Sequence, residues 1–262
     1  MSSLERSPAL RRILLFGPAL VVAVVNLAHP LTRSDAYGAI APHVQWWITL
    51  HAINLLAFPF MGLSAYLLIR RQDGWPVTLG VVALAIYAPA YAGFDALAGM
   101  GTGVLIASTA AAGQGFNAAP LVTAYFNSPV IYALAAIGSI AWTIAMLASV
   151  LAFTPAGRPR TTAAVVALVA FAAQGWARGT LFSPDGLPTT AWWGVAIASI
   201  IAMSLAARPR IVAALLTAAA TLFGAMHTPP TGPLGALCFV AAAALIEFRY
   251  ADRAAIAEPA PR

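Results

Sequence analysis

The stretch QWWITLHAINLLAFPFMGLSAYLLI, residues 45–69, decides the class of fold. It contains no Asp, Glu, Lys or Arg, and it is followed directly by Arg70 and Arg71. A helix needs about 17–25 predominantly apolar residues to cross the hydrocarbon core of a bilayer. The stretch therefore predicts a transmembrane helix that ends at a pair of arginines on the membrane surface.

The same pattern recurs along the whole chain of 262 residues, of which 61% are hydrophobic and only 8% are charged. Eight apolar segments are predicted as membrane spans, at about residues 13–29, 45–69, 75–99, 129–153, 163–182, 191–207, 211–227 and 233–248. So apolar a composition is typical of membrane proteins rather than of a soluble domain. We expect an all-α fold, an integral membrane bundle of eight transmembrane helices, forming a single polytopic domain over residues 1–262.

The arginines predict the orientation of these helices. Twelve of them fall on one side of an eight-span arrangement, namely Arg6, Arg11, Arg12, Arg70, Arg71, Arg158, Arg160, Arg208, Arg210, Arg249, Arg253 and Arg262. Only Arg33 falls in a loop on the opposite side. Basic residues accumulate in cytoplasmic loops, so both termini are predicted to be cytoplasmic. The net charge of +6 comes from these clusters and does not indicate a nucleic-acid partner.

Two absences exclude whole classes of chemistry. The chain has no lysine, which rules out a Schiff base, a lysine general base and a Walker-type nucleotide loop. Its one cysteine, Cys238, rules out an internal disulfide framework and a cysteine-based zinc knuckle.

A faint internal repeat is visible. Tryptophan pairs open the second and the sixth predicted spans, at residues 46–47 and 192–193, while Asp95 and His227 close the third and the seventh. A 4+4 tandem duplication would account for this pattern. The alternative is that both pairs belong to the belt of aromatic residues found at membrane surfaces.

Five polar residues, on five different spans, share one depth: His29, His51, Asp95, Arg178 and His227. At about 1.5 Å per residue, they lie roughly 22–30 Å from the cytoplasmic end of their spans. That depth is near the outer edge of a hydrocarbon layer about 30 Å thick. Ionisable side chains at such a depth usually face the interior of the bundle and carry function.

Four of the five have a polar neighbour three or four residues away on the same helix face; the pairs are Asn26–His29, His51–Asn54, Tyr91–Asp95 and Gln174–Arg178. Plainer roles stay open. The histidines would also suit helix–helix hydrogen bonds or helix C-caps, and Asp95 would also suit an ion pair with Arg178.

Three imidazoles and one carboxylate are a ligand set for zinc, iron, manganese or copper. We therefore predict His29, His51, His227 and Asp95 as metal ligands. Two facing histidines would instead suit a haem iron. Neither an HxxxH nor an HExxH spacing is present.

The runs NLAHP, WWITLHAINLLAFPFMGLSAYLL, YAGFDALAGMGTGVL and HTPPTGPLGALCF resemble a family of uncharacterised polytopic membrane proteins of actinobacteria and related bacteria. The resemblance implies a multi-span helical protein of the bacterial cytoplasmic (inner) membrane and supplies no activity, substrate or cofactor. The chain lacks the late-helix HxxxH of the zinc-dependent ceramidase and progestin-receptor superfamily, so that hydrolase activity does not carry over.

These observations favour a metal- or haem-dependent enzyme acting at the outer leaflet on a lipophilic or small anionic substrate. Asp95 would be a fourth ligand or the general base, and Arg178 would anchor an anionic group. A proton-coupled small-solute transporter or channel is the alternative, with Asp95 and His51 carrying protons. A structural or assembly protein is the third possibility. The lipid bilayer is the one partner that the sequence implies, and it does not indicate an oligomeric state.

Overall fold

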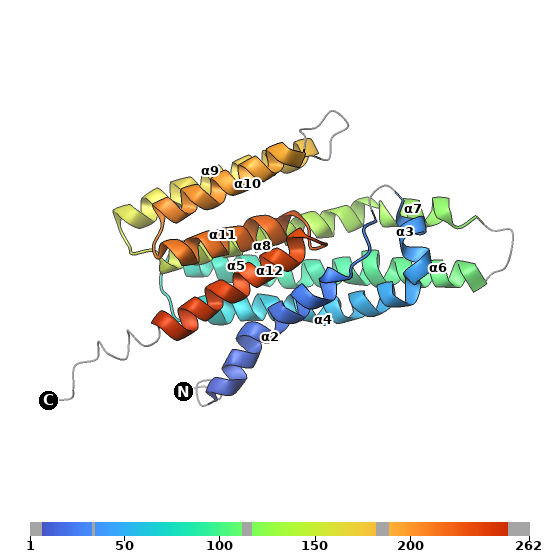
Figure 1. The fold of residues 1–262 in the computed structure, drawn as a ribbon, viewed down its shortest axis with the longest axis horizontal. Coiled ribbons are helices and arrows are strands. Elements are labelled where there is room, and N and C mark those ends of the chain that lie inside the picture. Colours follow the sequence, from blue (N-terminus) through green and yellow to red (C-terminus); the bar gives the residue numbers. More distant parts are fainter. Residues whose placement is uncertain (1–6, 33–34, 112–116, 182–188, 251–262) are drawn as a thin grey trace.

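The computed structural model describes residues 7–32, 35–111, 117–181 and 189–250, and the regular structure in these ranges is entirely helical. Long helices run side by side in alternating directions (Figure 1). The bundle consists of α2 (Pro8–Leu27), α4 (Val44–Ile69), α5 (Trp75–Phe94), α8 (Pro129–Phe153), α11 (Arg210–Ala225) and α12 (Thr231–Leu245).

Two further helices form a hairpin beside this bundle. α9 (Arg158–Leu181) packs along α10 (Thr189–Ala206), and α10 packs on α11 (Figure 1). Gln174 of α9 reaches the bundle, where its Nε2 donates a hydrogen bond to Thr221 Oγ1 of α11 at 2.9 Å.

Each of the eight predicted segments coincides with a helix or its direct extension. Five helical stretches in the described ranges are long and apolar enough to cross a membrane, namely Pro8–Leu27, Ala36–Ile69, Trp75–Thr109, Pro129–Phe153 and Thr231–Phe248. Thr190–Ala206 and Arg210–Ala225 are shorter apolar helices. An all-α protein with several membrane-length helices is thus confirmed, whereas eight crossings and the 4+4 repeat stay predictions.

The α4–α5, α8–α9 and α10–α11 connections lie at the same end of the bundle as the start of α2, because successive helices alternate in direction (Figure 1). The described arginines Arg11, Arg12, Arg70, Arg71, Arg158, Arg160, Arg208 and Arg210 belong to these segments. There, Arg11 at the start of α2 forms an ion pair with Glu247 of η3 (Ile246–Tyr250). Arg12 lies over the ring of Phe248, with its Cζ 5.0 Å from the ring centroid. Which end faces the cytoplasm stays a prediction from the arginine count.

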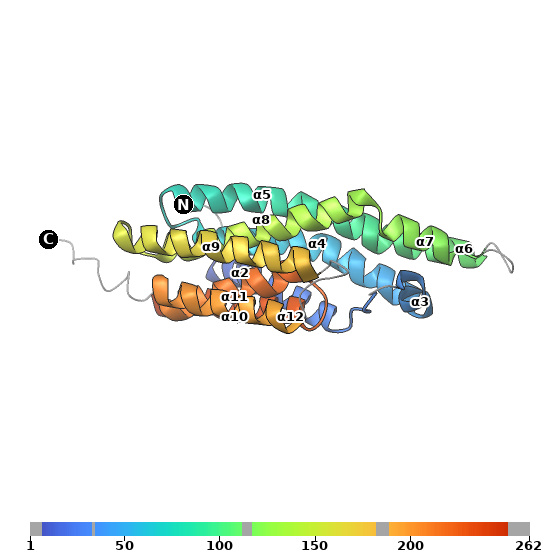
Figure 2. The same ribbon diagram turned by 90° about the horizontal axis from the view of Figure 1, so that it is seen from above.

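The opposite end is covered by short helices, as both ribbon views show (Figure 1, Figure 2). The third predicted span continues past residue 99 through a π-helical segment into a further α-helix, and an antiparallel helix returns beside it. These elements are α3 (Ala36–Ile40), the 3-10 turn η1 (Ala41–His43), the π-helix η2 (Asp95–Gly101), α6 (Thr102–Ala111) and α7 (Ala119–Phe126). They enclose a small apolar cluster around Ile40, Trp47 and Val122.

The interior between the two ends is packed with apolar side chains, including Phe58, Met61, Trp142, Met146 and Phe223, all fully buried. Large apolar side chains also cover the outside. Leu168 is 69% exposed and Val24 is 66% exposed. Many other large apolar side chains are exposed as well, and lipid is the solvent that suits such a surface.

Candidate metal centre

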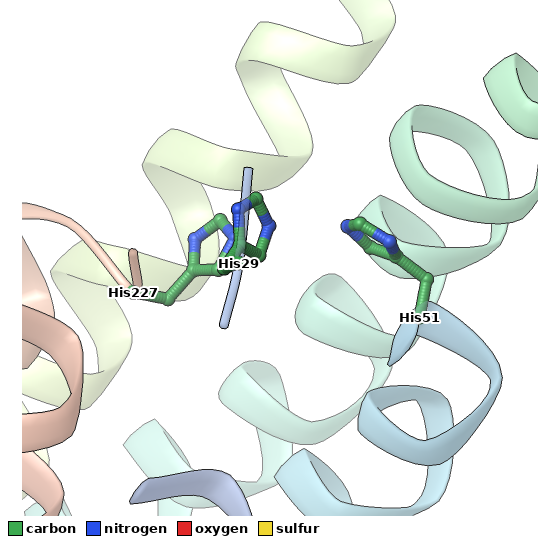
Figure 3. Close-up of side chains that lie close together, drawn as sticks. All are labelled: His29, His51 and His227. Atoms are coloured by element: carbon green, nitrogen blue, oxygen red, sulfur yellow. The ribbon is translucent and has the colours of Figure 1, made fainter. Parts of the chain in front are cut away.

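Three histidines from separate segments of the chain lie close together (Figure 3). His29 lies two residues after the end of α2, His51 lies on α4, and His227 lies two residues after the end of α11. One ring nitrogen from each lies within 4.8 Å of the other two. The ring centroid of His29 is 5.2 Å from that of His51 and 5.2 Å from that of His227. The predicted convergence of the three histidines is therefore confirmed.

The hydrogen bonds of two rings determine which nitrogen is left for a ligand. His29 Nδ1 donates to the backbone carbonyl of Pro30 at 2.7 Å, and His51 Nδ1 donates to that of Trp47 at 2.8 Å. With the proton on Nδ1, each neutral ring presents a lone pair at Nε2. Metal-binding histidines are usually oriented in this way, by a hydrogen bond from the nitrogen that does not bind the metal.

Two of the three histidines have an unpartnered ring nitrogen in the described part of the chain. The Nε2 atoms of His29 and His227 are buried, and neither forms a hydrogen bond with any residue that the structure describes. His29 is 6% exposed and His51 is 1% exposed. Buried polar atoms without partners are rare, and a bound ion or water is the usual explanation.

Asp95 is a buried carboxylate that also lacks hydrogen-bond partners in the described part of the chain. It opens η2, is fully buried, and places Oδ1 3.9 Å from His51 Nε2. Neither carboxylate oxygen accepts a hydrogen bond from the described part of the chain. Burying an ionised carboxylate without a donor or cation is strongly unfavourable. Asp95 therefore needs a cation or a proton, and it faces the histidine nitrogen that a cation would bind.

Two contacts hold η2 against α4 and so aim Asp95 at His51. Trp47 Nε1 donates a hydrogen bond to the carbonyl oxygen of Gly99 at 2.7 Å. Gly99 also touches the His51 ring so closely that a Cβ there would overlap the ring. π-helical turns inside α-helices occur frequently at functional sites. Here the π-helix carries Asp95 at its start and the glycine of the close contact in its middle.

A pair of amides fixes α2 against α4 one turn further into the bundle. Asn26 Nδ2 donates to Asn54 Oδ1 at 3.2 Å, and Asn54 Nδ2 donates to Asn26 Oδ1 at 3.1 Å. Both residues are fully buried. Because each asparagine lies three residues from a histidine on its own segment, the reciprocal pair sets the register in which His29 and His51 meet.

Aromatic rings surround the histidines. Trp47 lies 4.2 Å from the His51 ring, between centroids, and 5.1 Å from the His29 ring. The His227 ring lies 5.3 Å from Phe94 and 5.9 Å from Phe58. These rings keep bulk water away from the site, so electrostatic interactions within it are stronger than they would be in water.

Four of the five polar residues predicted at one depth thus come together: the three histidines and Asp95. The backbone of Arg178 lies in α9, but its side chain is outside the described part of the chain. The sequence prediction missed Trp47 and Gly99. Both follow the helical spacing, since each lies four residues from a predicted ligand, His51 or Asp95.

Comparison of the chain with protein-family models, with curated proteins and with solved structures gave no match. The family resemblance of the sequence motifs therefore stays a prediction.

Proposed function

We propose that the chain is a multi-span enzyme of the bacterial cytoplasmic membrane and that its catalysis depends on a bound divalent transition metal ion. The ligands are His29, His51 and His227, with Asp95 as a fourth ligand or as the base beside the ion. The observation that carries the proposal is the meeting of three buried imidazole nitrogens with a buried carboxylate that has no hydrogen-bond donor.

The spacing supports a metal ion after small ring movements. Zinc lies about 2.0–2.1 Å from histidine nitrogens, which places tetrahedral ligand atoms about 3.4 Å apart. The three nitrogens lie within 4.8 Å of one another, and Asp95 Oδ1 is 3.9 Å from His51 Nε2. Ring shifts of about 1 Å close the remaining distance. Zinc, iron, manganese and copper all accept such a set of three nitrogens and one oxygen.

A haem fits these residues less well. A haem iron held by two histidines has the flat macrocycle between the two rings. Here the rings of His51 and His227 both pack edge-on against His29, at interplanar angles of 71° and 80°. Trp47 and Phe94 fill the adjoining space. The arrangement leaves no layer for a porphyrin, so a single ion is the cofactor that we propose.

A bound divalent ion of this kind supplies Lewis acidity and lowers the pKa of a coordinated water to about 7. The residues of the chain would do the rest. The three imidazoles hold the ion, and Asp95 accepts a proton from the group beside it when it is not itself a ligand. The surrounding rings exclude bulk water. Arg178, at the same predicted depth, would anchor an anionic group of a substrate that arrives from the outer leaflet.

Proton-coupled transport has one observation in its favour, the His51–Asp95 pair. A transporter also needs a polar route to the other end of the bundle. Buried serines in that direction bond to helix carbonyls: Ser64 Oγ donates to Phe60 and Leu14, and Ser149 Oγ donates to Ala145. The core around them is apolar. This arrangement disfavours a proton path through the bundle and favours a single closed site.

Metal analysis of the purified protein tests the proposal. The protein is loaded with zinc, iron, manganese or copper, freed of excess metal, and its metal content is measured by mass spectrometry beside its absorption spectrum. About one ion per chain is expected. His51→Ala and His227→Ala should lose it, whereas His43→Ala should keep it because His43 is exposed at the end of η1.

Equal metal content in all three variants, or none in the unchanged protein with any of the four metals, would contradict the proposal. A Soret band would show that haem is the cofactor instead.

A further inference from the structure

The charges at the centre do not balance once a divalent ion is bound. Metal-binding imidazoles are neutral, so His29, His51 and His227 contribute no negative charge. Asp95 contributes one negative charge. Among the buried residues that the structure describes, Asp95 is the only carboxylate. A divalent ion with these ligands therefore carries one uncompensated positive charge.

No other described carboxylate is placed to compensate it. Asp35 is exposed and caps α3, where its side chain accepts a hydrogen bond from the backbone of Gly38. Glu247 is paired with Arg11 at the far end of the bundle, and Asp73 is exposed in the connection between α4 and α5 at that same end. The charge is thus surrounded by the rings of Trp47 and Phe94 rather than by counter-charges.

A net charge in such surroundings is costly because burial removes its hydration, and an opposite charge in direct contact lowers that cost. We infer that the free coordination position of the proposed metal centre takes a small monovalent anion, and that the substrate or the reacting group is of this class. The inference rests on the proposed metal site and deepens it.

The burial of the site limits the size of the anion. Asp95 is fully buried, and His51 is 1% exposed. A single negatively charged donor atom satisfies both the charge and the space. It has two possible sources: hydroxide formed from coordinated water, or the carboxylate or other anionic end of a small substrate.

Titration of the cobalt(II)-loaded protein with azide tests the inference, because the visible bands of cobalt report each change of ligand. The full-length protein in detergent should show a saturable change of these bands at constant ionic strength. Asp95→Asn raises the charge of the loaded site by one unit. This variant should bind azide at least about tenfold more tightly, because it lacks the negative charge of Asp95 that repels the anion. Such repulsion is strong at a buried site.

Asp35→Asn is the matched control, because it removes the same charge from an exposed position away from the metal. Its azide affinity should equal that of the unchanged protein. Acetate replaces azide in a second titration. A pH-dependent change of the cobalt bands that azide suppresses would identify hydroxide as the resident anion, and a response to acetate would identify a carboxylate-bearing substrate.

Cobalt bands that show histidine ligation but do not respond to azide in the unchanged protein would overturn the inference and leave the metal site standing. Equal azide affinities for the unchanged protein and a folded Asp95→Asn would also overturn it. Failure to bind cobalt at all would overturn the proposed function and the inference together.

Discussion

Replacing Gly99 by alanine tests whether the close contact between η2 and α4 builds the metal centre. A Cβ on Gly99 would overlap the Cβ, Cγ and Cδ2 atoms of His51. Relief of this overlap requires a shift of the His51 ring by about 1 Å, because carbon atoms pack at about 3.5–4.0 Å. Metal binding needs a ring movement of this size in a defined direction, and the final ligand distances tolerate only about ±0.2 Å. A Cβ packed against the ring would prevent that movement, so His51 should drop out of the ligand set.

Gly99→Ala should lower the free energy of unfolding only moderately, although it should lose most of the bound metal. Overpacking costs about 1–3 kcal/mol, and the higher helix propensity of alanine offsets up to about 1 kcal/mol. Metal content and the melting temperature with and without metal are the measurements. Gly99→Ala should lose most of its metal and most of the metal-dependent rise in melting temperature.

Gly175→Ala on α9 is the matched control, because a Cβ at Gly175 would meet nothing within 4 Å. It should keep its metal and its stability. If Gly99→Ala bound metal as tightly as the control, the contact between Gly99 and His51 would not build the site, and the reasoning would be wrong.

Three further predictions concern the framework around the site. Asn26→Ala leaves the buried amide of Asn54 unpaired and should lower the free energy of unfolding by about 1–3 kcal/mol, and the Asn26→Ala/Asn54→Ala double variant should lose less than the sum of the single variants in detergent denaturation. Asp95→Asn should remain foldable and bind metal more weakly than the unchanged protein, while the three histidines still load it at saturating metal; equal loss of folded protein in Asp95→Asn and Arg178→Gln, relieved in the double variant, would instead reveal a structural ion pair. Reporter fusions in every predicted cytoplasmic connection should read cytoplasmic, and one clear reading on the opposite side would break the eight-span topology.

Depth was the part of the site that the sequence could predict. The rise of a helix per residue is nearly constant, so counting from the cytoplasmic end of each span placed His29, His51, Asp95 and His227 in one layer. The sequence also predicted that Asn26 and Asn54 share a helix face with His29 and His51. The two asparagines do hydrogen-bond to each other beside these histidines.

The rotation of each helix about its own axis and the close contacts between helices could not be predicted by counting residues. A lipid-facing helix is apolar on all sides, so periodicity did not show that Trp47 turns inward while Trp46 is 38% exposed. The π-helical turn and the fit of Gly99 against His51 depend on a partner helix 48 residues earlier in the chain, which a local pattern does not encode.

The X-ray absorption spectrum of the zinc-loaded protein tests the central claim most directly. The account predicts three imidazole nitrogens at about 2.0–2.1 Å, with the remaining positions filled by oxygen or an anion. His227→Ala, measured with less than one equivalent of added zinc and without the step that removes weakly bound metal, should show two imidazoles. Zinc surrounded by oxygen alone, or the same number of imidazoles in the unchanged protein and in His227→Ala, would contradict it.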